Sequence, residues 1–163
     1  VVMKPGSGQM TNTPLEYFDL QVNGYGGFDF NQDDLSAEDL NSACRKIDAD
    51  GVDGVLATII TERIDSMCRR LRRIVQIRER DPLVCRIVVG FHIEGPFVNE
   101  RDGFRGAHPL DAVVPAAVDP MQRLLDAAGG LTRIVTLAPE RDRKMAVTSP
   151  LSAREKCSRP IVG

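Results

Sequence analysis

Short runs rich in β-branched residues alternate with amphipathic helical patterns, and this alternation restricts the fold more than any other feature of the chain. Strands are predicted over residues 18–23, 52–60, 86–94 and 133–138, and a helical pattern or a long loop separates each from the next. Strands that alternate with helices run parallel and are joined by right-handed crossovers. We therefore expect an α/β fold with about four parallel strands and crossover helices.

Three predicted helices begin at recognisable signals. Residues 36–39 read Ser-Ala-Glu-Asp, which is typical of a capping box, and an apolar stripe follows it at helical spacing. Thr61 is expected to cap the second helix, whose apolar stripe consists of Ile64, Met67, Cys68, Leu71 and Val75. Asp119 followed by Pro120 predicts the start of the last helix.

The composition excludes several classes of function. The net charge is −2, which argues against the broad basic face of a nucleic-acid-binding protein. No apolar run comes near the roughly 20 residues of a membrane span. Residues 1–13 lack periodicity and the apolar stretch of a signal peptide. We expect a cytoplasmic protein with no nucleic-acid or membrane partner.

Arginines and cysteines allow two interpretations each. The second predicted helix carries seven arginines, which either bind phosphate or nucleic acid or form the solvated outer face of a crossover helix; we favour the solvated face. Cys44, Cys68 and Cys85 fall within apolar patterns, and the chain has no Cys-x-x-Cys pair. We therefore expect these cysteines to be small apolar core residues rather than metal or redox sites.

Polar residues recur on one face of two predicted strands. In the first strand Asp19, Gln21 and Asn23 share a face, and in the third strand His92 and Glu94 share a face. Each unpaired polar group on a buried face costs about 1–3 kcal/mol. Because ligands bind at the carboxyl ends of parallel strands, we predict a site there. The alternatives are an internally satisfied polar network and an edge strand with one solvated face.

The connection after Glu94 is unusually long. About two dozen residues precede the next predicted helix, whereas such connections usually have about 2 to 6. The loop contains His108, one of only two histidines in the chain. A histidine near a carboxylate can polarise a carbonyl group or transfer a proton, although taken alone His108 reads as a surface residue.

Four segments together resemble the N-acetylglucosamine-6-phosphate deacetylases, a family of the amidohydrolase superfamily. They are DLQVNGYGG at 19–27, FHIEGPF at 91–97, GAHP at 106–109 and LAPE at 137–140. The resemblance runs from about residue 18 to about residue 142. It implies a partial (β/α)8 TIM barrel, with residues 14–145 as the N-terminal half of the barrel, 1–13 as an irregular segment and 146–163 as an atypical tail.

The resemblance also implies a reaction and a metal. The reaction is hydrolysis of the acetamide of N-acetylglucosamine 6-phosphate to glucosamine 6-phosphate and acetate. The expected cofactor is one divalent metal ion, usually zinc, which activates water. Glu94 stands at the position of the metal-ligand glutamate, with Gln21 as an additional candidate ligand. Asn23 and His92 are expected to orient the metal ligands without binding the metal themselves.

Two loop positions match substrate contacts of the family. His108 corresponds to the histidine that contacts the acetyl carbonyl group, and the backbone of Ala107 corresponds to a sugar contact. The resemblance therefore implies an amino-sugar phosphate as substrate, and a homodimer as assembly.

The sequence also departs from the family pattern. A full barrel has about 250 residues, and the two later metal-ligand histidines and the catalytic aspartate have no counterpart in this chain. We therefore expect no catalytic residue and an incomplete metal site here, because a catalytic zinc normally has three protein ligands. The alternative to a deacetylase is a truncated, non-catalytic remnant that folds or binds ligand without turnover.

Overall fold

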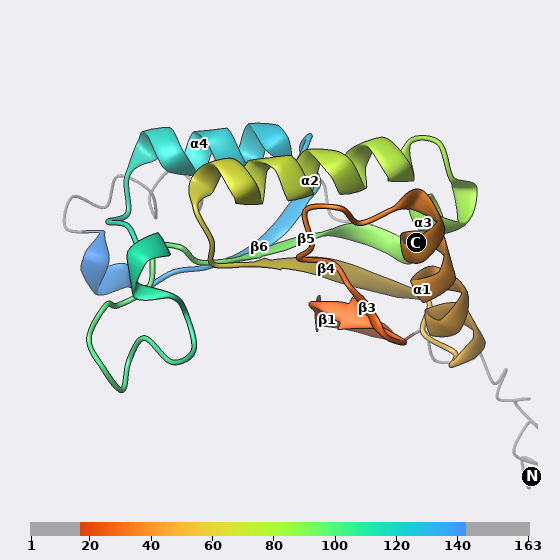
Figure 1. Cartoon of the computed structure of the whole chain (residues 1–163), viewed down its shortest axis with the longest axis horizontal. Coiled ribbons are helices and arrows are strands. Elements are labelled where there is room, and N and C mark those ends of the chain that lie inside the picture. Colours follow the sequence, from red (N-terminus) through yellow and green to blue (C-terminus); the bar gives the residue numbers. More distant parts are fainter. Residues whose placement is uncertain (1–16, 143–163) are drawn as a thin grey trace, which may run out of the picture.

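The computed structural model describes residues 17–142 and arranges them around a parallel sheet of order β1-β4-β5-β6 (Figure 1). The strands of this sheet are β1 (Phe18–Val22), β4 (Gly54–Ile60), β5 (Val88–Glu94) and β6 (Thr132–Thr136). The helices are α1 (Ala37–Ala49), α2 (Ile64–Arg78), α3 (Pro82–Ile87) and α4 (Val118–Ala127), with short 3-10 turns η1 (Leu110–Ala112) and η2 (Pro139–Arg141). The expected four parallel strands are confirmed, whereas the predicted segments 1–13 and 146–163 lie outside the described residues.

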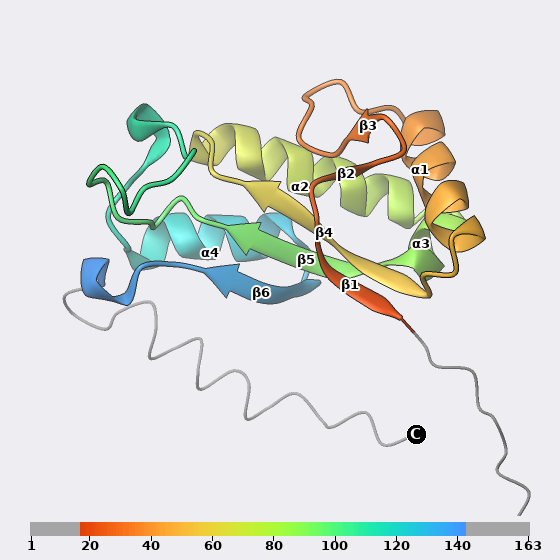
Figure 2. The ribbon, with the colours of Figure 1, turned by 90° about the horizontal axis from the view of Figure 1, so that it is seen from below.

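Helices α2 and α4 pack on one side of the sheet. Helices α2 and α4 lie side by side over it in Figure 1, and the view from below shows β4, β5 and β6 in front of them (Figure 2). Alternate residues of β4, namely Val55, Ala57 and Ile59, join the helices in one apolar core. Phe91 and Ile93 of β5 do the same. The intervening residues of β5, including His92 and Glu94, therefore belong to the opposite face.

A small hairpin follows β1 where only a turn was predicted. Strands β2 (Gly24–Tyr25) and β3 (Phe28–Asp29) pair antiparallel around Gly26 and Gly27. Beyond the hairpin, buried Asn31 donates from Nδ2 to the Thr58 carbonyl (3.0 Å) and accepts from the Ile60 N–H (3.0 Å). The hairpin segment is thereby joined to the carboxyl end of β4.

The first helix begins as predicted, but the second does not. Ser36 Oγ accepts a hydrogen bond from the Asp39 N–H (3.0 Å), and the predicted apolar stripe of α1 is buried. Thr61 does not cap α2, because α2 begins after Arg63 and the Thr61 hydroxyl donates to the Glu94 carbonyl instead (2.9 Å). In the α2 stripe Ile74 and Ile77 are buried, whereas Val75 is half-buried.

Two further helix starts differ from prediction. Residues 86 and 87 are not strand, since α3 occupies them; Asp81 caps this helix by accepting from the N–H groups of Leu83 (2.9 Å) and Val84 (3.1 Å). Asp119 is not a cap, because α4 begins one residue earlier and Pro120 lies within its first turn, where proline is tolerated.

The apolar residues of β1 are less buried than alternation predicted. Phe18 and Leu20 remain 50% and 55% exposed, and only Val22 joins the core. β1 is a terminal strand of the described sheet, and its register with β4 shifts between Asp19 and Val22. The alternation of buried and exposed side chains therefore does not continue along the whole strand. Cys85 is also exposed, contrary to prediction, whereas Cys44 and Cys68 are buried.

Candidate functional site

The carboxyl ends of β1 and β5 bring two predicted metal-site residues together. Gln21 Nε2 donates a hydrogen bond to Glu94 Oε2 (3.3 Å), although 73 positions separate them and β4 lies between their strands. Glu94 is half-buried, and Gln21 is exposed. An amide and a carboxylate therefore meet at the edge of the sheet where ligands of parallel α/β folds bind.

His92 is buried on the same face of β5 and links three strands. Its Nδ1 lies 3.2 Å from the Leu20 carbonyl oxygen of β1, and its Nε2 lies 2.7 Å from Thr136 Oγ1 of β6. Its side chain is thus satisfied internally, as one of the alternatives for these polar positions anticipated.

The backbone on either side of Glu94 is held by neighbouring strands. The Thr61 hydroxyl donates to the Glu94 carbonyl, and the Gly95 N–H donates to the Thr136 carbonyl (3.0 Å). Gly95 has φ +81°, a conformation that favours glycine, and a β-carbon there would overlap the Thr61 hydroxyl oxygen. These contacts determine where the chain leaves the sheet after Glu94.

The loop after β5 extends past the carboxyl edge on the side away from α2 and α4 (Figure 1). His108 is half-exposed, and its backbone carbonyl accepts from Arg105 Nη1, while its N–H donates to the Arg105 carbonyl (3.4 Å). Arg105 also pairs with Asp102 (3.3 Å). Ala107 is exposed in the same turn. No hydrogen bond of the described residues joins His108 or Ala107 to Glu94.

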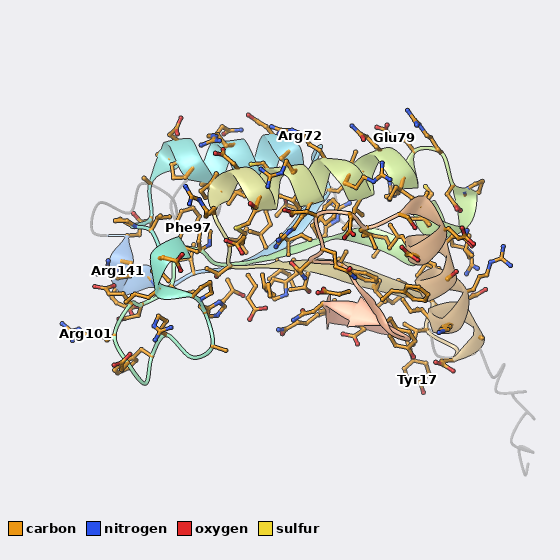
Figure 3. All side chains as sticks on the ribbon, viewed as in Figure 1. Tyr17, Arg72, Glu79, Phe97, Arg101 and Arg141 are labelled. Carbon is orange, nitrogen blue, oxygen red and sulfur yellow. The ribbon has the colours of Figure 1, made fainter. Side chains whose placement is uncertain are left out.

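The base of this loop is attached to η2. Asn99 Nδ2 donates to Glu140 Oε1 (2.8 Å), and this hydrogen bond lowers the pKa of the Glu140 carboxyl below its usual value. Arg141 pairs with Glu100 (2.7 Å). Figure 3 shows Arg101 and Arg141 at this end of the molecule, so the segment after β6 supports the loop that carries His108.

Asn23, another predicted site residue, belongs to the hairpin rather than to the Gln21–Glu94 contact. Its carbonyl accepts from the Phe30 N–H (2.9 Å) and from Asn31 Nδ2 (3.4 Å). A shallow, open hollow is lined by residues 23–29. The structure therefore places Gln21, His92 and Glu94 at one edge, and Asn23 beside them in the hairpin.

Comparison with known proteins gives the relationship of the chain. It is 35% identical over 147 residues to N-acetylglucosamine-6-phosphate deacetylase of Homo sapiens, an alignment that covers 86% of this chain and 34% of that protein. The chain is homologous to the N-acetylglucosamine-6-phosphate deacetylases. It spans about a third of the length of the curated relatives it matches. No protein-family model matches the chain.

Solved deacetylase structures show the same fold over this region. The enzyme from Mycobacterium smegmatis matches with a TM-score of 0.68 and 25% identity, over 86% of this chain and 37% of that one. A variant of that enzyme in complex with N-acetyl-D-glucosamine-6-phosphate matches with a TM-score of 0.66 and 26% identity, over 82% and 32%. The four-stranded sheet thus corresponds to part of the barrel of these deacetylases.

The described residues do not supply a complete metal centre of the kind a deacetylase of this family is expected to use. Among residues 17–142, no group of three or more histidine, cysteine, aspartate or glutamate side chains could hold a metal ion. Glu94 and Gln21 amount to one carboxylate and one amide, whereas a catalytic zinc normally has three protein ligands. A metal at this edge would require further ligands.

The contacts that three residues make near the carboxyl edge of the sheet were not predicted from the sequence. Thr136 binds His92, Thr61 binds the Glu94 carbonyl, and Asn31 binds the end of β4. The signal for Thr61 and Thr136 was available, since both are polar residues at the carboxyl ends of predicted strands. Asn31 carried no such signal, because its role depends on the unpredicted hairpin.

The hydrogen bonds and ion pairs of the α2 arginines involve neither Gln21 nor Glu94. Arg70 pairs with Asp33 (2.8 Å), and Arg73 and Arg78 donate to the carbonyls of Leu35 (3.1 Å) and Val88 (2.8 Å). Arg72 is exposed on the outer side of the helix (Figure 3). These contacts favour the interpretation of a crossover helix with a solvated outer face. Among the described residues, no helix is long and apolar enough to cross a membrane.

Proposed function

We propose that this chain supplies part of the active site of a metal-dependent deacetylase that hydrolyses the acetamide of N-acetylglucosamine 6-phosphate, giving glucosamine 6-phosphate and acetate. The homology supports the reaction class, and the related enzyme crystallised with N-acetyl-D-glucosamine-6-phosphate supports the substrate. The observation that carries the proposal is the contact between Gln21 and Glu94 at the carboxyl edge of the sheet (3.3 Å).

In this proposal Glu94 is the metal ligand and Gln21 is an additional candidate ligand. Glu94 carries the only negative charge of the pair, and its half-buried position at the end of β5 limits the hydration of its carboxylate. Gln21 donates an N–H to Glu94, which leaves its amide oxygen free to face a ligand at the same edge. A single divalent ion, expected to be zinc, would activate water when bound with ligands beyond those described.

The loop residues are proposed to contact the substrate. His108 is assigned to the acetyl carbonyl group and the Ala107 backbone to the sugar. The loop turn around Arg105 engages the backbone of His108, which leaves the imidazole available for a ligand. Asn23 and His92 are proposed to support the site from the hairpin and from β5. By the same homology, the assembly is proposed to be a homodimer.

The test measures zinc binding and acetate release in parallel. The purified chain is incubated with zinc and N-acetylglucosamine 6-phosphate, and Glu94→Gln is compared with Glu79→Gln. Glu79 is exposed at the end of α2, away from the proposed site, and provides the same chemical change (Figure 3). Removing a group that merely orients a metal ligand already costs about 10- to 100-fold in affinity, so Glu94→Gln is expected to weaken zinc binding at least about tenfold, whereas Glu79→Gln leaves it unchanged.

The outcomes separate the two candidate functions. Turnover that Glu94→Gln abolishes supports the deacetylase. Ligand binding without acetate release, in a chain shown by circular dichroism to be folded, supports a non-catalytic binding protein. Zinc binding that is equal in the parent chain and in Glu94→Gln contradicts the assignment of Glu94.

A further inference from the structure

His92 is buried, and its imidazole ring contacts two other strands of the sheet. It is 6% exposed, and its two ring nitrogens contact groups of strands β1 and β6. Strand β6 pairs directly with β5, whereas β4 lies between β5 and β1. Neither contact involves Glu94. The proposed reaction leaves this imidazole without a stated chemical role beyond support.

The partners of the ring determine which nitrogen carries the proton. The Leu20 carbonyl oxygen can only accept, so Nδ1 must be the donor in that contact (3.2 Å). In a neutral imidazole with a protonated Nδ1, Nε2 is an acceptor. The hydroxyl of Thr136 therefore donates its single proton to Nε2 (2.7 Å).

This arrangement leaves the Thr136 oxygen as a pure acceptor toward everything else. Thr136 is exposed, and it is the register partner of Glu94 at the end of β6. Both residues lie at the carboxyl edge, and the same face carries His92, two positions before Glu94. An exposed residue whose hydroxyl oxygen has a fixed orientation thus lies next to Glu94 in the strand register.

We propose that His92 is a positioning residue that fixes the Thr136 hydroxyl as a hydrogen-bond acceptor for an N–H or O–H donor of the ligand. For an amino-sugar phosphate, the donors of that class are the sugar hydroxyls and the acetamide N–H. The choice of ligand rests on the proposed function, whereas the His92–Thr136 arrangement rests only on the contacts described above.

The arrangement is tested first without any ligand. Long-range proton–nitrogen NMR in mildly alkaline buffer reads the tautomer of each neutral imidazole, and the chain has just two histidines to assign. His108→Gln identifies the remaining signal as His92. The expected result is a proton on Nδ1 and none on Nε2. A proton on Nε2 in the neutral ring overturns the proposal.

Variants of Thr136 test the hydrogen bond itself. Thr136→Val is expected to shift the His92 Nε2 signal, and Thr136→Ser, which keeps a hydroxyl, is expected to retain it. Thr132→Val is the matched control, since Thr132 is at the other end of β6 and its buried hydroxyl has no hydrogen-bond partner among the described residues. A His92 signal that is insensitive to Thr136→Val contradicts the arrangement.

Binding of N-acetylglucosamine 6-phosphate tests the ligand half of the proposal. Loss of one neutral hydrogen bond weakens binding by about 2- to 12-fold, so Thr136→Val is expected to bind that much more weakly than the parent and than Thr136→Ser. Equal affinities overturn the assignment of Thr136. If the parent chain binds no sugar phosphate, the proposed function and the ligand assigned to Thr136 both fail, and the NMR result still decides the His92–Thr136 arrangement.

Discussion

Gly95→Ala is expected to destabilise the protein strongly, because Gly95 forms the turn that follows Glu94. The residue has φ +81°, and a β-carbon added there would overlap the hydroxyl oxygen of Thr61. Thr61 is itself 3% exposed and donates to the Glu94 carbonyl (2.9 Å), so it has little freedom to move. The substitution therefore combines an unfavourable backbone conformation with a steric conflict.

The two contributions can be separated. A left-handed conformation costs a residue with a β-carbon about 1–2 kcal/mol, and overpacking a buried position costs typically about 1–3 kcal/mol. Gly95→Ala is therefore expected to lower the free energy of unfolding by about 2–5 kcal/mol, a large part of the roughly 5–15 kcal/mol that stabilises a typical domain. Thr61→Ala removes the overlapping oxygen, after which the nearest Thr61 atom, Cβ, would lie 3.3 Å from the new carbon.

The assay is urea unfolding of the parent, both single variants and the double variant, followed by circular dichroism. Thr61→Ala alone is expected to cost about 1–3 kcal/mol because it leaves the Glu94 carbonyl without its hydroxyl donor. The double variant is expected to lose about 1–3 kcal/mol less than the sum of the singles. Gly103→Ala is the matched control, since Gly103 has φ +85° and nothing within 4 Å of the added carbon. Additive single effects, or equal effects of Gly95→Ala and Gly103→Ala, would refute the steric argument.

Three further predictions concern stability and thiol reactivity. Ser36→Ala removes the cap of α1 and should cost about 1 kcal/mol in urea unfolding; an unchanged midpoint would show that the cap contributes nothing. A hydrogen bond from Arg70 (2.8 Å) holds the pKa of Asp33 below its ordinary value, so this contribution to stability is present above that value and is lost as pH falls through the folded pKa. Asp33→Asn should therefore flatten the stability profile below about pH 4, and an unaltered acid limb would contradict this. Burial raises the pKa of the Cys44 thiol to about 12, whereas Cys85 is exposed, so peptide mapping should find Cys85 alkylated in the native protein and Cys44 only after unfolding.

The order of elements was predictable because parallel α/β folds have strong local signals. β4 and β5 read as strands owing to their β-branched residues, and the Ser36 cap marks α1. The two Asp-Pro pairs show where local signals fail. Asp81-Pro82 begins α3, a helix that was not predicted and whose last two residues were assigned to a strand, whereas Asp119-Pro120 lies inside the first turn of α4. The same dipeptide fits either position, and tertiary packing decides between them.

The site was predictable in part for a similar reason. Period-2 alternation placed Gln21 and Glu94 at one edge, and the structure brings their side chains within 3.3 Å. The same alternation was wrong for Phe18 and Leu20, because β1 shifts register against β4 and forms the end of the described sheet. The hydrogen bond from the Thr61 hydroxyl to the Glu94 carbonyl forms because β4 and β5 end side by side. No local pattern in either segment predicts this pairing.

The curvature of the sheet affects the candidate site, because the site residues come from β1 and β5, which are separated by β4. In a flat sheet two strands separated by a third lie about 9.6 Å apart, twice the usual spacing of about 4.8 Å. Side chains of β5 nevertheless contact β1 twice, through His92 and through Glu94. A sheet that curves toward this face brings these side chains closer together than a flat sheet does, so flattening the sheet would lengthen the distance between Gln21 and Glu94. A ligand bound by both side chains would therefore favour the curved sheet over a flat one.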